Sequence, residues 1–357
     1  MSDILEAANR FKLALLRGND KALAEMSRTY IKAWKRLAPQ FERITRMIAE
    51  AELAGEPVSP NWIMRQKRYR ELMISCEEEI MRYTRYAAAM VGDQQRFALS
   101  RGIKDSKRLM QLSLGLEPSD MERMRVRVTW NQVPEEAIKN IVGFLSDGSP
   151  ISYKFAGLAP EVSQGIKDTL SSGITMGWNP RKIASEIERV YKGALGNTLL
   201  TCRTETMRAY RTASMENYRA NSDVVSGWVW MSAKQPNTCA ACWAMDGTFH
   251  MLDEELVDHP GGRCVAVPVT KPYSELFPGA KLIGVRETKT KPWDPTPEFE
   301  KLSERDKRQV LGWSRYKLYK DGKLSLRDLA VKERSRSWGD HYRPKTVKEI
   351  NEELGND

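Results

Sequence analysis

Apolar residues recur at intervals of three and four along most of the first ninety residues, which is the spacing of one face of an α-helix. Pro39 interrupts this pattern and is expected to kink or break the helix. Gly55 and Pro57, followed by Ser59-Pro60, predict that one helix ends and another begins. The next pattern predicts a helix of roughly 40 residues, from Asn61 to about Ser100, and therefore an elongated helical hairpin or bundle.

The pattern becomes mixed beyond residue 100. The stretch from Gly102 to Asp120 is typical of a connection, and Val126, Val128 and Trp130 alternate as in a short strand. Helices are then predicted after Val133, from Pro160 to about Ser171, from Asn179-Pro180 onward and from about Asn197 to Arg219, and strands at Gly227–Met231 and Cys264–Val267.

The last ninety residues differ in composition from the rest. Five prolines fall from Thr270 to Pro297, a spacing that favours an extended arm. Helical spacing resumes from Phe299 to Tyr319, and a second short helix is expected near Leu326 to Glu333. The sequence therefore predicts an α+β, predominantly helical protein with four regions: a helical N-terminal region (1–120), a compact α+β domain (121–270), a proline-rich linker or arm (271–298) and a small helical C-terminal tail (299–357).

The chain is basic, with 57 Lys and Arg against 47 Asp and Glu and a net charge of +10. A basic balance favours polyanionic partners, such as double-stranded DNA or acidic protein surfaces, although a merely well-solvated surface has the same composition. No single dense Lys/Arg block stands out, so contact with DNA is expected to be diffuse binding to phosphates rather than reading of bases.

The sequence also bears on the compartment. No stretch approaches the roughly 18 uninterrupted apolar residues of a membrane-spanning helix. Charges are scattered through the apolar positions of the N-terminus, which is not the pattern of a signal peptide. Five cysteines are an odd count and too few for a disulfide scaffold, so synthesis in a reducing cytoplasm is expected.

The sequence contains no recognisable catalytic constellation. Histidine occurs only three times, and the phosphate-binding loop, the nucleophile elbow and the zinc-protease helix motif are all absent. Paired carboxylates such as Glu135-Glu136 and Glu254-Glu255 lie in charged stretches and are expected to be solvated rather than catalytic. We therefore expect that the protein is not an enzyme.

One cluster of side chains has the spacing of a metal site. Cys239, Cys242, His259 and Cys264 follow the order C-x2-C-x16-H-x4-C, which can supply four ligands to a closed tetrahedral site. His250 is a competing fourth ligand. The alternatives are free buried thiols or a Cys239–Cys264 disulfide without metal. The spacing therefore indicates one structural zinc ion as a hypothesis, beside these alternatives.

The same part of the chain resembles the phage Mu F-like head morphogenesis domain. The resemblance covers roughly residues 130 to 270 and rests on an ordered set of motifs: Arg203-Thr204-Glu205 on a helix, Trp228 and Trp230, the Cys239–Cys242 pair, Asp246-Gly247, and His259-Pro260-Gly261-Gly262-Arg263-Cys264. Gly262 is a departure, because it stands where the family usually has the first cysteine of Cys-Arg-Cys. The tail, from Leu311-Gly312 through Leu326, resembles related minor head proteins.

The resemblance implies a minor capsid protein of a tailed phage. Such a protein is associated with the portal at low copy number and acts in head assembly or in handling of the packaged genome, and it is a virion component assembled in the host cytoplasm. Its expected partners are the portal, capsid or scaffold proteins and double-stranded DNA. Arg203 and Glu205 are expected to act as an ion pair or as capping partners that fix their helix against the cysteine loop, not in catalysis.

Two other functions stay open at this point. The Mu F-like domain is sometimes fused to toxin-like or enzymatic modules, although such a module should bring its own motif. A zinc-containing nucleic-acid-binding regulator is a third reading, but a compact basic recognition helix beside the cysteines is missing.

Overall fold

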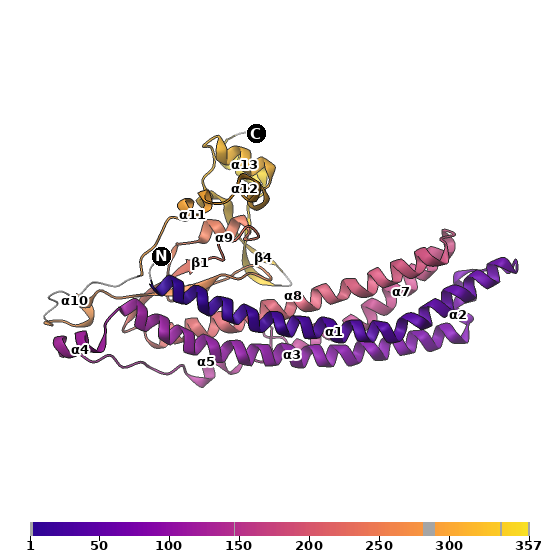
Figure 1. Ribbon diagram of the computed structural model, residues 1–357, viewed down its shortest axis with the longest axis horizontal. Helices are drawn as coiled ribbons and strands as arrows, with labels where there is room; N and C mark the ends of the chain where they lie inside the picture. The colour runs from indigo at the N-terminus through magenta and orange to yellow at the C-terminus, as the bar shows by residue number, and fades with distance from the viewer. Residues whose placement is uncertain (1–2, 146, 281–289, 336–337, 356–357) are drawn as a thin grey trace. The chain divides into compact units, whose positions relative to one another are not determined.

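The computed structural model describes residues 3–145, 147–280, 290–335 and 338–355 (Figure 1). The chain forms two compact units, each assembled from separated stretches. Unit 1 comprises Met1–Arg17, Arg96–Val142 and Met207–Asp357, and unit 2 comprises Gly18–Gln95 and Gly143–Thr206. Three long helices, α1 (Asp3–Leu53), α3 (Lys67–Leu114) and α8 (Pro180–Ala220), contribute residues to both. The units thus cut across the four consecutive regions expected from the sequence.

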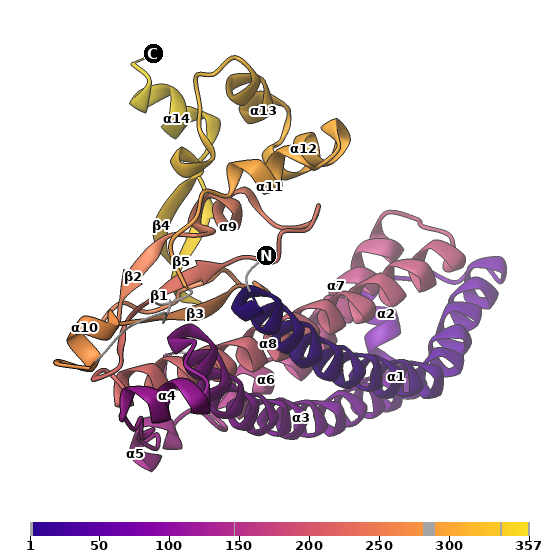
Figure 2. The same ribbon diagram turned by 60° about the vertical axis from the view of Figure 1, so that its left-hand side comes forward.

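Among the described residues of unit 2, all the regular elements are helices, and one isolated β-bridge pairs Phe144 with Pro150. The parts of the three long helices in this unit are joined by α2 (Pro60–Arg65), α6 (Ile151–Ala156) and α7 (Leu158–Thr175), which runs alongside α8 in Figure 2. Its core is rich in aromatic side chains: Tyr30 stacks on Tyr191 with ring centroids 4.5 Å apart and donates a hydrogen bond of 2.7 Å to the Tyr191 carbonyl oxygen. The helix starts expected at Ser59-Pro60 and at Asn179-Pro180 are confirmed, since Ser59 caps α2 and Asn179 caps α8.

Of the kink or break expected at Pro39, the break is wrong, because α1 continues as one helix from Asp3 to Leu53. Proline removes one backbone hydrogen bond and costs about 3 kcal/mol in a helix interior. Leu37 and Phe41, on either side of Pro39, are both buried in the core of unit 2. Burying two large apolar side chains contributes about 1.5–3 kcal/mol each, which is enough to offset the loss.

The connection expected from Gly102 to Asp120 is also wrong over most of its length, because α3 continues to Leu114. Gly102 is needed there for close packing against α8. A Cβ atom at this position would lie 2.6 Å from the Tyr210 backbone oxygen and 2.8 Å from Ala213 Cβ. The glycine at which the connection was expected to begin is therefore the contact point of two helices.

Unit 1 contains a three-stranded antiparallel sheet in the order β2-β1-β3, formed by β1 (Val225–Met231), β2 (Phe249–Met251) and β3 (Val265–Thr270). The strands expected near residues 227–231 and 264–267 are thereby confirmed. Trp228 and Trp230 on β1 are buried in a core with Met215 and Tyr218 of α8. The strand expected at residues 126–130 is wrong: no strand forms there in the described structure, and the adjoining Asn131 bonds to the end of α8 instead.

The remaining elements of unit 1 are short. They are α4 (Pro118–Met124), α5 (Glu135–Lys139), α9 (Ala240–Met245), α10 (Tyr273–Leu276), α11 (Thr296–Glu300), α12 (Glu304–Leu311), α13 (Trp313–Lys320), the 3-10 helix η1 (Leu326–Leu329), β4 (Ala330–Ser335), β5 (Gly339–Pro344) and α14 (Val347–Glu353). The second tail helix expected at Leu326–Glu333 is wrong beyond Leu329, because β4 pairs with β5 from Ala330 onward. Figure 2 shows this hairpin beside α9.

The expected arm, residues 271–298, is described except for 281–289. Its described ends are packed: Thr290 is buried and bonds to Ser113, and Trp293 bonds to Asp246. Among the described residues, none of the helices combines the length and the apolar surface that crossing a membrane requires.

Candidate metal centre

Short elements of unit 1 position the four predicted ligands. Cys239 is the N-cap of α9, where its sulfur accepts a hydrogen bond of 3.4 Å from the Cys242 backbone N–H. Cys242 follows in the first turn of the helix. Cys264 immediately precedes β3, whose first residue, Val265, pairs with Met231 at the end of β1. His259 lies on the segment that returns from β2 to β3.

The structure brings these side chains together in two overlapping groups. The first is Cys239, Cys242 and His259, and the second is Cys242, Cys264 and Asp258. Within each group the potential ligand atoms all lie within 4.8 Å of one another, and Cys242 belongs to both. The four predicted ligands, called the donor cluster below, thus lie close enough to hold a metal ion. All five cysteines are free, so no disulfide joins Cys239 to Cys264.

Asp258 is a member of this site that the sequence analysis missed. Its carboxylate is buried, with a side-chain exposure of 1%, and accepts hydrogen bonds from the backbone N–H groups of His259 (2.9 Å) and Cys264 (3.0 Å) and from the Cys242 thiol (3.4 Å). It therefore contacts three of the four members of the donor cluster. The acidic residue was hidden in a segment with several other carboxylates, and only its position next to His259 distinguishes it.

Asp258 also explains the glycine that departs from the family pattern. A Cβ atom at Gly262 would lie 2.1 Å from Asp258 Oδ2, so the carboxylate fills the space that a side chain at position 262 would need. The Asp258 carboxylate, four positions earlier in the chain, thus occupies the space that the cysteine side chain of the family pattern would take.

Arg211 of α8 is the second residue that the sequence analysis missed. Its guanidinium donates to Asp258 Oδ2 (2.7 Å), to the Cys264 carbonyl oxygen (2.8 Å) and to the Gly262 carbonyl oxygen (2.8 Å). The planar fork of arginine suits such a set of fixed acceptors. Arg211 therefore fastens the helix to the segment that carries His259 and Cys264.

The protonation of the donor cluster is uneven. The hydrogen bond with Cys242 is the main cause that lowers the pKa of Cys239 to about 5, and His259 lowers it further against the opposing effect of burial. Burial by itself lowers the pKa of His259, but Cys239 and Asp258 outweigh it and raise this pKa to about 9. At neutral pH without a bound metal, Cys239 and His259 therefore form a thiolate–imidazolium pair.

The other two thiols stay protonated. Hydrogen bonds with Cys239 and Cys264, together with burial, raise the pKa of Cys242 well above its ordinary value, and burial raises that of Cys264. Three cysteine sulfurs and one imidazole are a set of ligands found in structural zinc sites. Asp258 accepts hydrogen bonds from three of these four residues, as the residues around the ligands of a metal site commonly do. The donors present fit a metal ion, and its binding would release the protons of Cys242, Cys264 and His259.

His250, the competing ligand, lies outside the donor cluster. Its ring stacks on Trp228 at 4.3 Å, and its two nitrogens bond to Thr248 Oγ1 (2.7 Å) and to Glu254 (2.9 Å). The imidazole is thus held by residues just before and after strand β2.

The Arg203-Thr204-Glu205 motif belongs to the part of α8 in unit 2. Arg203 pairs with Asp20 at 2.6 Å, and the buried Glu205 accepts a hydrogen bond of 3.4 Å from Gln95. Thr204 Oγ1 donates to the carbonyl oxygen of the preceding turn. The contact with the cysteine segment that was expected from this motif is made by Arg211, further along the same helix.

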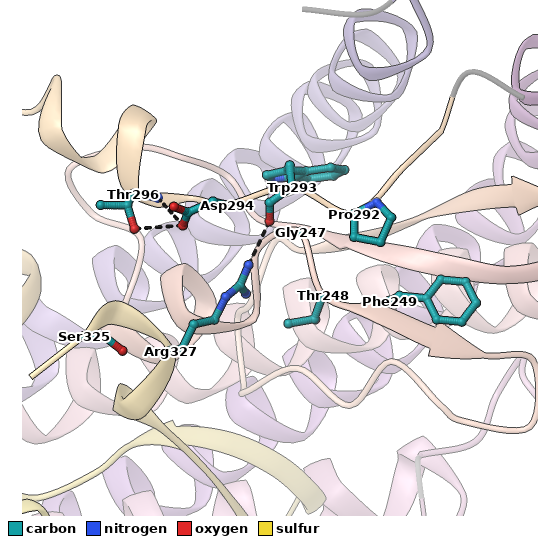
Figure 3. Close-up of a pocket in the computed structure, with 9 residues that line it drawn as sticks. All are labelled: Gly247, Thr248, Phe249, Pro292, Trp293, Asp294, Thr296, Ser325 and Arg327. Atoms are coloured by element: carbon teal, nitrogen blue, oxygen red, sulfur yellow. Dashed lines mark hydrogen bonds between the residues drawn. The ribbon is translucent and has the colours of Figure 1, made fainter.

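The Asp246-Gly247 motif lies at a pocket of unit 1 with a volume of about 780 Å³ (Figure 3). Gly247 has a φ of +81°, and a Cβ atom there would lie 2.1 Å from the Trp293 carbonyl oxygen. In Figure 3 the Arg327 side chain reaches that same carbonyl, and Thr296 bonds to Asp294. These hydrogen bonds hold residues 293–296 in place. Thr296 and Arg327, which line the pocket, are thus engaged in contacts within the protein.

The comparisons with known proteins agree with the position of this site. Residues 164–267 match the family model described as phage Mu protein F like protein, and this range contains Arg211, Asp258 and the whole donor cluster. No curated protein matches the chain, and no solved structure does. Over residues 164–267 this chain is therefore similar to the phage Mu protein F-like family, a family of phage head morphogenesis proteins.

Proposed function

We propose that this protein is a minor capsid protein of a tailed phage, bound at the portal and acting in head assembly and in handling of the packaged genome. The observation that carries the proposal is the family match over residues 164–267. The protein is then a virion component assembled in the host cytoplasm, with the portal and the capsid or scaffold proteins as its partners. The role is structural and involves no catalysis.

Copurification with the portal tests this proposal. The portal protein encoded with this chain would be co-expressed with the full-length protein, because truncation at residue 120 would remove α1 and α3, which contribute to the cores of both units. We expect a complex that survives moderate salt. A portal that never copurifies with the full chain, at low or at high salt, contradicts the proposal.

The donor cluster, we further propose, holds one structural zinc ion. Support comes from the proximity of three sulfurs and one imidazole, and from the outer hydrogen bonds of Asp258. Between the end of α9 at Met245 and Cys264, the only regular element is the short strand β2, so a bound ion would fasten this segment in addition to the hydrogen bonds that it receives from Arg211.

Elemental analysis of protein purified without added metal tests the zinc site. We expect close to one equivalent of zinc in the wild type and a large loss in Cys242→Ser. The matched control is Cys76→Ala, which removes a buried thiol of unit 2 and should leave the zinc content unchanged. Less than about a tenth of an equivalent in the wild type, with the cysteines of the cluster reactive under native conditions, contradicts the metal site.

The protein is also proposed to bind double-stranded DNA without sequence preference. The support is its net charge of +10, since binding to phosphates alone weakens steeply with salt and does not depend on base sequence. A preferred site found by selection from random oligonucleotides would contradict this part of the proposal.

A further inference from the structure

A line of basic side chains runs along one face of α1 within unit 2. Its members are Lys21, Arg28, Lys32, Lys35, Arg43 and Arg46, which we call the α1 basic stripe. At 3.6 residues per turn, their positions fall within a sector of about 80° around the helix axis. The opposite side of the helix carries Tyr30, Leu37 and Phe41, which are buried in the core of unit 2, and this burial fixes the direction in which the stripe faces.

All six side chains of the stripe are exposed. In the part of the chain that the structure describes, no ion pair or hydrogen bond is recorded for any of the six. Arg36, just outside the sector, is different: it pairs with Glu79 of α3 at 2.5 Å. Glu25 and Glu42 lie at the two borders of the stripe, so the stripe keeps a clear excess of positive charge.

The length of the stripe matches a nucleic acid duplex. Lys21 and Arg46 are 25 residues apart, which at 1.5 Å per residue is about 38 Å. A B-form duplex rises 3.4 Å per base pair, so this length corresponds to about 11 base pairs of phosphate backbone.

The composition of the stripe selects the kind of polyanion. Single-stranded nucleic acid is bound on aromatic platforms, and protein interfaces depend on exposed aromatic or apolar anchors. Over residues 21–46 the only large hydrophobic side chain of α1 that is strongly exposed is Ile31, which lies outside the sector of the stripe. Asn and Gln, which read adenine in the major groove, do not occur within it. A line of lysines and arginines suits the phosphates of a duplex.

We propose that the α1 basic stripe is the surface on which this protein binds double-stranded DNA, by contacts to the phosphate backbone and without reading of bases. This inference rests on the proposed DNA binding and assigns it to one helix face. The proposal differs from the diffuse contact with DNA that was expected from the sequence. The six basic residues are separated by three to eight positions in the chain, but they form a single line because α1 is helical.

The experiment measures binding of the full-length protein to a fluorescent 30-base-pair duplex of random sequence over a series of salt concentrations. The test variant combines Arg28→Gln, Lys32→Gln and Lys35→Gln. Glutamine has a helix propensity close to those of lysine and arginine, so α1 should be retained, and a thermal melt checks this. The control variant combines Arg305→Gln, Lys317→Gln and Lys323→Gln, which removes the same charge from three exposed sites of unit 1.

We expect the stripe variant to bind about a hundredfold more weakly near 0.1 M salt, and its slope of log affinity against log salt to fall by about 2 to 3. The control variant should stay within about threefold of the wild type, with the same slope. An equal loss in the two variants overturns the assignment to α1 but leaves DNA binding itself standing. No binding by the wild type at low salt overturns both. A stripe variant that keeps its DNA affinity but loses the portal shows that the stripe contacts protein instead.

Discussion

Arg211 and Asp258 form an ion pair whose side chains are 8% and 1% exposed, beside the donor cluster. Removing one member of such a pair leaves an uncompensated buried charge, which typically costs about 3–5 kcal/mol. We expect Arg211→Met to lower the free energy of unfolding of unit 1 by this amount in urea titrations. Arg211→Lys should recover only part of it, because one ammonium group cannot reproduce the fork that reaches three acceptors.

The control for this prediction is Arg203→Met in the same helix. Arg203 pairs with Asp20, but the two side chains are 34% and 59% exposed. Exposed pairs contribute about 0–1 kcal/mol. If Arg203→Met and Arg211→Met lower the free energy of unfolding by similar amounts, the Arg211–Asp258 ion pair contributes no more to stability than an exposed ion pair does.

Lys12 gives unit 1 a dependence on alkaline pH. Its Nζ donates to the Ser232 carbonyl oxygen at 2.9 Å, and burial lowers its pKa from 10.5 to about 8. Below pH 8 the lysine is charged in both the folded and the unfolded chain, and the folded state bears the full cost of burying the charge. Between pH 8 and 10.5 the unfolded chain holds a proton that the folded chain has lost. The contribution of Lys12 therefore makes stability rise with pH through this window.

Comparison with Lys12→Met isolates this effect from other titrating groups. From pH 7.5 to pH 10 the free energy of unfolding of the wild type should rise by up to about 3 kcal/mol relative to the variant. Urea titrations at the two pH values measure it. If the difference between the two proteins is the same at both, Lys12 does not titrate in this window.

At the scale of single elements, two helical glycines have opposite expected effects. A Cβ atom at Gly102 would lie 2.6 Å from a backbone oxygen of α8, whereas Gly193 in α8 has nothing within 4 Å of that position. We expect Gly102→Ala to destabilise the protein by about 1–3 kcal/mol through overpacking. Gly193→Ala should stabilise it by about 0.5–1 kcal/mol, since alanine is the better helix former. Thermal melts of the two variants that shift in the same direction would contradict this packing argument.

Local signals were sufficient to predict some elements. The starts of α2 and α8 follow from a capping side chain and a proline at the first helical position, and β1 and β3 follow from short apolar runs. The full lengths of α1 and α3 did not follow. Whether Pro39 or Gly102 ends a helix depends on what packs beside it, and that contact is made by residues far away in the sequence.

The candidate site was predictable to a similar extent. The Cys-x2-Cys pair, His259 and Cys264 were recognisable because their spacing is itself the signal. Asp258 and Arg211 were not, because a carboxylate in an acidic segment and an arginine in a helix have no distinguishing pattern until the fold brings them within 2.7 Å of each other. The β4–β5 hairpin was missed for the same reason, since its alternation is weak and its stability depends on pairing.

At the scale of the whole molecule, the two units have separate hydrophobic cores but share three helices. The core of unit 2 contains Tyr30, Cys76 and Tyr191, whereas the donor cluster packs with the core of unit 1 around Trp228 and Trp230. Covalent continuity through α1, α3 and α8 could make the chain unfold as one unit, while separate cores favour local unfolding of each.

Hydrogen exchange distinguishes these two behaviours. We expect Cys242→Ser, which removes a ligand of the donor cluster, to lower amide protection over residues 232–270 and to leave the helices of unit 2 protected. Cys76→Ala, which opens a cavity in the other core, should do the reverse, with faster exchange in unit 2 and an unchanged donor cluster. If either variant instead raises exchange by the same factor in both units, the shared helices couple them into a single cooperative structure, and a metal in unit 1 would stabilise the entire protein.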